Sequence, residues 1–167
     1  QANRGMPQKR AFQVEDQKTE SLVIKKKVGL TQSYLSIGAR TVPSSYQDSP
    51  ALNLISILLG GGTSSRLFAE LREKHAVTYD VNATHCKGRD YGYFNVYCAV
   101  NSKNVNKAKR LIFKEIQRLR TEKVSANELE PSKNMILGAA LRGIDSLEEA
   151  PDILTYMEIQ FQHENAL

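Results

Sequence analysis

The chain has 167 residues, of which 41% are hydrophobic and 25% charged, and its formal net charge at pH 7 is +5. This length suits one domain that buries its own core without disulfide or metal staples, and the composition excludes disordered, collagen-like and membrane-spanning classes of protein. The basic residues are scattered among acidic ones, which is typical of a solvated surface rather than of a nucleic-acid-binding tail.

The two ends of the sequence predict a piece of a longer protein. Residues 1–18 are polar and contain Gly5 and Pro7, as expected for a linker that arrives from a preceding domain. The first residues include no apolar signal segment, and the last ones continue a helix-like pattern without a stop signal. We therefore expect one domain over residues 19–167 that is truncated at its C-terminus.

The first structured elements are predicted to be two strands and a helix. Residues 21–30 and 32–40 are β-branched or alternating, which indicates two strands with a turn near Gly29. Pro50 is a favourable first helical residue, and the helix predicted over residues 50–59 is apolar almost all round, so it should be buried on several sides.

A run of three glycines, Gly60 to Gly62, is predicted to end this helix, because glycine adopts left-handed backbone angles without a steric clash. Thr63 or Ser64 would then cap a second helix that continues to about Lys74. Its apolar side chains should face the core, and its charged ones should lie on polar faces.

Residues 77–84 and 91–100 alternate between apolar and polar residues around the turn residues 87–90, which predicts a β-hairpin. Cys86 and Cys98 fall on the two strands at positions that are not opposite one another, so we expect no disulfide. Two cysteines without a disulfide framework favour the cytoplasm.

The last third of the sequence predicts helices. An amphipathic pattern begins at Val105, and the capping box formed by Ser125 and Glu128 starts a further helix at Ala126. Gly143 is predicted to end that helix, and Ser146 opens a second capping box for the last one. The order of elements predicts an α+β domain with a mostly antiparallel sheet and helices packed on one face.

The side chains that could carry chemistry form few groups. His75, His85 and His163 are far apart in the sequence and fit no zinc motif, and the glycine run lacks the lysine of a phosphate-binding loop. Arg72 near a helix end and Tyr79 early in the next strand are suited to hydrogen-bond a peptide carbonyl or a developing oxyanion. Taken alone, the two residues favour the simpler interpretation, a surface arginine and a half-buried tyrosine.

The segment from Leu58 to Tyr79, with the pattern LxGGGxSSRLFxELREKxxxxY, resembles the insulinase, or pitrilysin-type, zinc metallopeptidases. The resemblance continues at residues 48–52, 90–94 and 125–133. It points to the second, C-terminal-type domain of a family half, because the inverted zinc motif HxxEH of the first domain is absent from this sequence.

This resemblance implies the fold of a metalloprotease half, as in mitochondrial processing peptidase, where two halves of two α+β domains each enclose a chamber. Arg72 and Tyr79 match family residues that reach the substrate near the zinc, and Phe68 is a weaker candidate for the same wall. Zinc-activated water would attack the peptide carbonyl while Tyr79 and Arg72 donate hydrogen bonds to its oxygen. Val77 and Thr78 stand where relatives usually have Leu-Ala or Leu-Gly.

The zinc would come from an N-terminal domain or a partner subunit of the same family, in a dimer of halves, so this fragment should ligate no metal and be inactive alone. One alternative is a structural or processing-assembly subunit on the same fold, without peptidase activity. A second is a nucleic-acid-binding module that uses the basic helix around residues 103–120. A third, a remnant without ligand contacts, is disfavoured by the presence of Arg72 and Tyr79.

Overall fold

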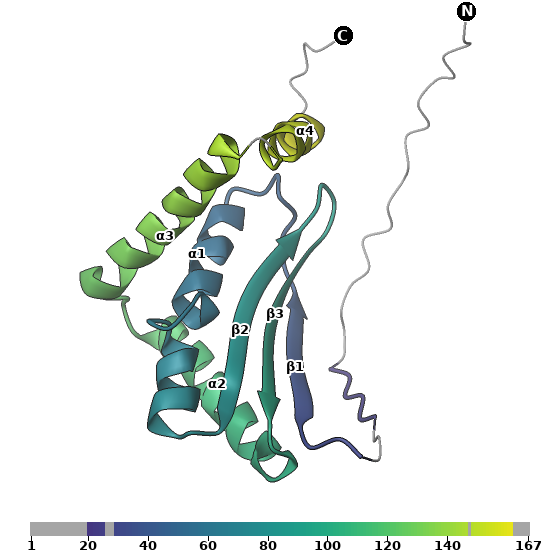
Figure 1. The fold of residues 1–167 in the computed structure, drawn as a ribbon, viewed down its shortest axis with the longest axis vertical. Helices are drawn as coiled ribbons and strands as arrows, with labels where there is room; N and C mark the ends of the chain where they lie inside the picture. The colour runs from purple at the N-terminus through teal and green to yellow at the C-terminus, as the bar shows by residue number, and fades with distance from the viewer. Residues whose placement is uncertain (1–19, 26–28, 147, 162–167) are drawn as a thin grey trace, which may run out of the picture.

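The computed structural model describes residues 20–25, 29–146 and 148–161, with side chains to residue 155. The predicted linker over residues 1–18 lies outside the described residues. In chain order (Figure 1) the elements are β1 (Ser33–Arg40), α1 (Ser49–Gly60), the π-helix η1 (Phe68–Lys74), β2 (Thr78–Lys87), β3 (Gly92–Val100), the short 3₁₀ helix η2 (Ser102–Asn104), α2 (Val105–Thr121), α3 (Ala126–Asp145) and α4 (Ala150–Phe161).

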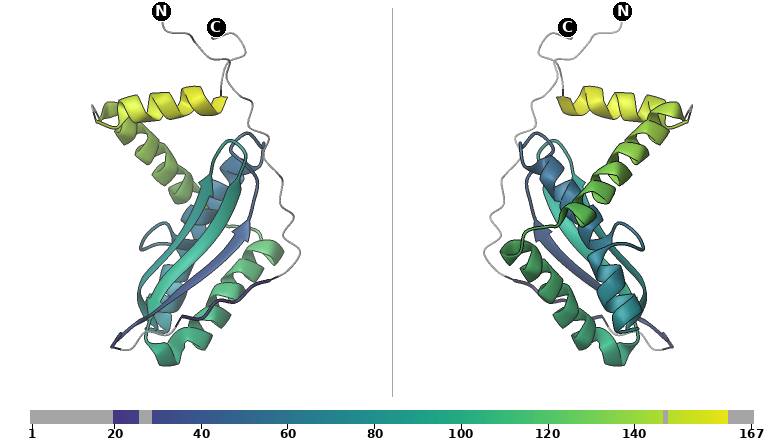
Figure 2. Two further views of the ribbon diagram at one scale, coloured as in Figure 1. Left: turned by 90° about the vertical axis from the view of Figure 1, so that its right-hand side faces the viewer. Right: turned by 90° about the vertical axis from the view of Figure 1, so that its left-hand side faces the viewer.

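The three described strands form one antiparallel sheet in the order β1-β3-β2. The central strand β3 pairs with β1 from Ser33 opposite Val100 to Arg40 opposite Tyr93. It pairs with β2 on its other side through the predicted hairpin. Figure 2 shows the sheet with helices on one of its faces, which confirms the predicted α+β fold.

The hydrophobic core lies between this face and the helices α1, η1 and α2. The three helices and the central strand β3 contribute fully buried apolar side chains, among them Leu59, Leu71, Val96, Cys98 and Ile112. The alternation of β3 puts Val96, Cys98 and Val100 inward, as predicted. Burial raises the pKa of the Cys98 thiol to about 11, so this cysteine is a protonated core residue.

The strand predicted over residues 21–30 is wrong. The described residues in that range, 21–25 and 29–30, contain no strand, although Gly29 makes the expected turn with a positive φ of 85°. Leu22, Val23 and Ile24 are more than 70% exposed. An apolar run becomes a strand only where a neighbouring strand pairs with it, and among the described residues β1 is the edge of the sheet on this side.

Helix α3 continues two residues beyond the predicted end at Gly143. A Cβ at Gly143 would lie 2.5 Å from Ile153 Cδ1, so this glycine permits close packing of α3 against α4 and does not cap the helix. The predicted cap at Ser146 is present, since its hydroxyl accepts the Glu149 amide at 3.2 Å. Within the described residues, no helix has both the length and the apolar character needed to cross a membrane.

Candidate functional site

The connection between α1 and η1 brings the predicted site residues close to the sheet. A Cβ at Gly60 would lie 2.2 Å from the backbone nitrogen of Ala83, so α1 packs directly on β2 at this glycine. Gly62 has a φ of 131° and reverses the chain, as the glycine run predicts. The helix that follows has no side-chain cap, and the Ser65 hydroxyl donates to the Gly62 carbonyl oxygen at 2.7 Å instead.

We call residues 66–80 the helix-to-strand junction. The predicted second helix is present here, but residues 68–74 form a π-helix, a rare conformation that often marks functional sites. Leu67 and Leu71 are fully buried beneath it. On its exposed side, the Arg72 guanidinium carbon lies 4.7 Å from the centre of the half-buried Phe68 ring, within cation–π distance.

The junction ends in two backbone irregularities. Ala76 has a φ of 48°, in the left-handed region that non-glycine residues rarely adopt. The Ala76 N–H donates a hydrogen bond to the Arg72 carbonyl oxygen, and the Val77 N–H donates one to the Leu71 carbonyl oxygen. The pairing of β2 with β3 then shifts between Thr78, opposite Val100, and Asp80, opposite Ala99, so Tyr79 is the extra residue of a β-bulge.

Thr78 holds this bulge in place. It is 4% exposed, its hydroxyl donates to the Ala99 carbonyl oxygen at 2.5 Å, and the same oxygen accepts the Asp80 amide at 3.2 Å. Strict alternation would place Tyr79 on the buried face with Val81. The bulge instead turns Tyr79 outward, where it is 82% exposed, so the expectation of a half-buried tyrosine is wrong.

The structure brings all three predicted site residues together. Arg72 Nη1 donates to the Tyr79 carbonyl oxygen at 3.2 Å, and the same guanidinium lies over the Phe68 ring. Within the described part of the chain, no hydrogen bond or ion pair engages the Tyr79 hydroxyl or the other Arg72 N–H groups. The Tyr79 hydroxyl and several Arg72 N–H groups are therefore available as hydrogen-bond donors at the surface.

Two ion-pair groups anchor the junction to neighbouring helices. Arg66, 8% exposed, forms a bidentate pair with Glu128 at 2.8 and 2.9 Å. Glu128 also completes the capping box of α3, and the Arg66 contact lowers the pKa of this carboxyl. Glu70 accepts hydrogen bonds from Lys114 of α2 and from Lys74, and the Lys114 bond is the main cause of its lowered pKa.

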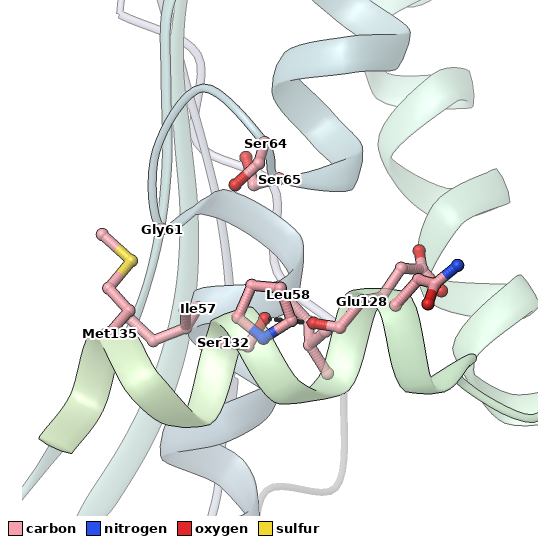
Figure 3. Close-up of a pocket in the computed structure, with 10 residues that line it drawn as sticks. Ile57, Leu58, Gly61, Ser64, Ser65, Glu128, Ser132 and Met135 are labelled. Atoms are coloured by element: carbon pink, nitrogen blue, oxygen red, sulfur yellow. Dashed lines mark hydrogen bonds between the residues drawn. The ribbon is translucent and has the colours of Figure 1, made fainter.

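A small cavity of about 100 Å³ lies between the end of α1, the glycine-rich turn and the start of α3 (Figure 3). Its walls are partly apolar, with Ile57, Leu58 and Met135, and partly polar, with Ser64 and Ser132. Neither Arg72 nor Tyr79 lines it. The candidate site is therefore the exposed surface of the junction, outside this cavity.

The histidines do not form a metal centre in the part of the chain that the structure describes, where no group of three or more potential ligands occurs. His85 lies between Asn53 and Thr41, with its ring nitrogens 3.0 and 3.1 Å from their side-chain oxygens. Burial lowers its pKa, so it is a neutral structural residue. His163 lies outside the described residues.

The basic face of α2, predicted as an alternative nucleic-acid surface, is partly neutralised. Lys114 is paired with Glu70, and Arg118 is paired with Glu115 and Glu122. These contacts reduce the positive charge that the helix could offer to phosphates.

Thr78, which holds the bulge, is the residue of this site whose role sequence reasoning missed. The pattern of residues 77–84 alternates without interruption, and a bulge inside an alternating run leaves no signal in a single sequence. The positive φ of Ala76 is likewise unmarked, because glycine or asparagine normally indicates that conformation.

Comparison with known proteins adds family information to this geometry. A family model described as the peptidase M16 inactive domain matches residues 1–136. An uncharacterized zinc protease of Bacillus subtilis, YmxG, is 27% identical over 128 residues, which cover 77% of this chain and 31% of that protein. The chain thus spans about a third of the length of this curated relative.

Solved structures share the fold. A protease from Helicobacter pylori superimposes with a TM-score of 0.73 at 20% identity, over 81% of this chain and 33% of that one. A peptidase M16 inactive domain from Pseudomonas fluorescens superimposes with a TM-score of 0.61 at 22% identity, over 66% of this chain and 27% of that one.

Proposed function

Because the chain belongs to the peptidase M16 family, as an example of its inactive domain, we propose that it binds the substrate peptide of a zinc peptidase through Phe68, Arg72 and Tyr79. The family membership confirms the resemblance to insulinase-type peptidases found in the sequence. The relatives that carry the name zinc protease support peptide hydrolysis as the activity of the whole protein.

The observation that carries this proposal is the exposed pair at the junction. The Arg72 guanidinium is held by two contacts, to the Phe68 ring and to the Tyr79 carbonyl oxygen, and still has free N–H donors. Tyr79, whose backbone carbonyl receives this hydrogen bond, is 82% exposed. A guanidinium held in place and an exposed phenol on the same junction suit the carbonyl oxygens of an extended peptide. They suit still better the negative oxygen that develops when such a carbonyl is attacked.

The chain's own residues do not fit a zinc ion. The sequence contains no HxxEH motif, and the described part of the chain holds no cluster of potential ligands. In the proposed function, the zinc-bearing site belongs to a neighbouring domain or to a partner subunit of the same family. The role of this chain is to close over the peptide, orient its carbonyl groups and stabilise negative charge on oxygen.

The test is peptide hydrolysis by the full-length protein, alone and together with any zinc-bearing partner subunit. Removal of one oxyanion donor costs about 100-fold or more in rate. We expect Arg72→Ala and Tyr79→Phe each to lower kcat by about 100-fold while the unfolding midpoint stays unchanged, because both side chains are exposed.

Arg110→Ala and Tyr46→Phe are matched controls, because both residues are exposed and lie outside the junction. They should leave the rate unchanged. If wild-type protein cleaves nothing with any partner, or if the two junction variants match the controls, the chain is instead a structural or processing-assembly subunit.

A further inference from the structure

The face of the sheet opposite the core carries aromatic and polar side chains. We call it the outer sheet face. The described helices pack on the other side (Figure 2). The outward positions of the three strands include Tyr34, Ser36, Arg40, Asp80, Asn82, Thr84, Cys86, Tyr93, Asn95, Tyr97 and Ala99. The Ser36 hydroxyl donates to the Asn95 side chain at 2.7 Å, so part of this face is already organised.

Two tyrosines of this face form a platform. The rings of Tyr34 and Tyr97 lie 6.0 Å apart with an interplanar angle of 18°, a stacked arrangement. Tyr34 is 62% exposed. Stacked and still accessible rings present negative π-faces, which attract cations.

Asp80 stands on the same row of the sheet as Tyr34. Both residues pair with Ala99 of the central strand, Tyr34 from β1 and Asp80 from β2. Strands are about 4.8 Å apart, so the backbones of Tyr34 and Asp80 are separated by about 10 Å across the small side chain of Ala99. Tyr97 lies on the next outward row of β3, which places all three side chains around Ala99.

The Asp80 carboxylate has no cationic partner among the described residues, although its side chain is exposed. Its backbone amide donates to the Thr78 hydroxyl oxygen at 3.2 Å, so the bulge fixes the position from which the carboxylate projects. Its negative charge contributes to the raised pKa of the Tyr97 phenol, after burial and Tyr34.

We propose that Tyr34, Tyr97 and Asp80 form a subsite for a lysine or arginine side chain of the bound peptide. The proposal rests on the proposed function, since it names a class of substrate for the same surface. Tyr79 and Asp80 are adjacent in the bulge, so a peptide that contacts the Tyr79 phenol passes within reach of the Asp80 carboxylate. A cation there receives an ion pair from Asp80 and a π-face from the tyrosines.

Charge complementarity selects this occupant. An anionic side chain would meet an unpaired carboxylate, and a neutral aliphatic one would leave that carboxylate without a partner. At a partly exposed site, the ion pair and the cation–π contact are each worth about threefold in affinity, so the two together favour a cationic peptide by about tenfold.

The experiment compares two fluorescently labelled ten-residue peptides that differ only in three spaced positions, occupied by arginine in one and by its uncharged isostere citrulline in the other. Affinity for the full-length protein is measured by fluorescence anisotropy, which requires no hydrolysis. We expect wild-type protein to bind the arginine peptide about tenfold more tightly than the citrulline peptide.

Single-residue variants test which side chains cause the preference for the arginine peptide. Asp80→Asn and Tyr34→Leu should each reduce the ratio of affinities about threefold, whereas Tyr34→Phe should preserve it because phenylalanine retains the π-face. Asp90→Asn is the matched control, because it removes the same charge from an exposed position in the hairpin turn, and it should leave the ratio unchanged.

Two results would overturn the subsite: equal binding of both peptides by wild-type protein, or equal ratios for Asp80→Asn and Asp90→Asn. Arg72→Ala separates this failure from that of the proposed function. If Arg72→Ala weakens both peptides alike while Asp80→Asn leaves their ratio unchanged, the subsite is wrong and the peptide-binding role stands. If Arg72→Ala has no effect while the ratio still depends on Asp80, the subsite stands without the proposed function.

Discussion

Strand β2 begins in a bulge beside a π-helix and continues as a regular partner of β3. In the regular part, from Val81 to Lys87, each residue faces one residue of β3, and from Val81 to Thr84 the side chains alternate between core and solvent. In the helix-to-strand junction, a π-helix, a positive φ and a bulge follow one another within thirteen residues, from Phe68 to Asp80.

The difference shows how one short segment builds a surface. Regular pairing would have buried the side chain of Tyr79, and the bulge exposes it beside Arg72 and Asp80. The irregular backbone nevertheless rests on fully buried leucines and on ion pairs to α2 and α3. The junction is therefore irregular without being loosely packed, and the predictions below test this contrast with the hairpin.

The largest effect on stability is expected from Leu71, which is buried beneath the junction. Leu71 is 0% exposed, and Leu71→Ala should lower the free energy of unfolding by about 3 kcal/mol, because it removes buried apolar contacts and leaves a cavity. Urea unfolding measures this change. The exposed neighbour Glu73 provides the control, since Glu73→Ala should change stability by less than about 0.5 kcal/mol. Equal effects of the two variants would mean that the junction is not packed on the core.

A smaller effect is expected from the residue that holds the bulge. Thr78→Val should cost about 2 kcal/mol of stability, because the buried Ala99 carbonyl loses the hydroxyl that donates to it. Peptide affinity should fall as well, since Tyr79 and Asp80 lose their fixed positions. Thr84→Val, at an exposed position of the regular part of β2, should leave both the unfolding free energy and the affinity nearly unchanged. A similar response at the two threonines would contradict the role of Thr78.

The smallest effects are expected from alanine-to-glycine substitutions, which should change stability in opposite directions in the junction and in the regular strand. Ala76 adopts a φ of 48°, which is unfavourable for alanine and accessible to glycine, so Ala76→Gly should stabilise the protein by about 0.5 kcal/mol after the entropy of the unfolded chain is included. Ala83→Gly, in the regular strand, should destabilise it by about 1 kcal/mol. Thermal unfolding of both variants measures the signs, and a loss of stability in both would contradict the strained conformation of Ala76.

The regular helices and strands could be predicted from the sequence. The hairpin followed from the alternation of residues 91–100, the start of α3 from the capping box at Ser125, and the end of α1 from its glycines. These signals are local, because each depends on residues within one turn or one strand. The strand expected over residues 21–30 failed because strand formation needs a partner that no local pattern reveals.

The residues of the candidate site were proposed from the sequence, and the geometry that joins them was not. Arg72, Tyr79 and Phe68 came from the resemblance of the segment 58–79 to a family, and their mutual contacts required the structure. The π-helix, the left-handed Ala76 and the bulge depend on how the helix-to-strand junction packs against α2, α3 and β3, through Arg66, Glu70 and Thr78. A pattern read along the chain does not contain such contacts.

The most direct test of the account replaces Tyr79 with the photoreactive residue p-benzoylphenylalanine in the full-length protein and asks whether a bound peptide becomes crosslinked to it. The same replacement at Tyr46, also exposed and outside the junction, is the control. We predict a peptide crosslink at position 79 that an excess of unlabelled peptide abolishes, and none at position 46. Absence of a crosslink at position 79, or equal crosslinking at both positions, would contradict the claim that the junction presents its side chains to a peptide.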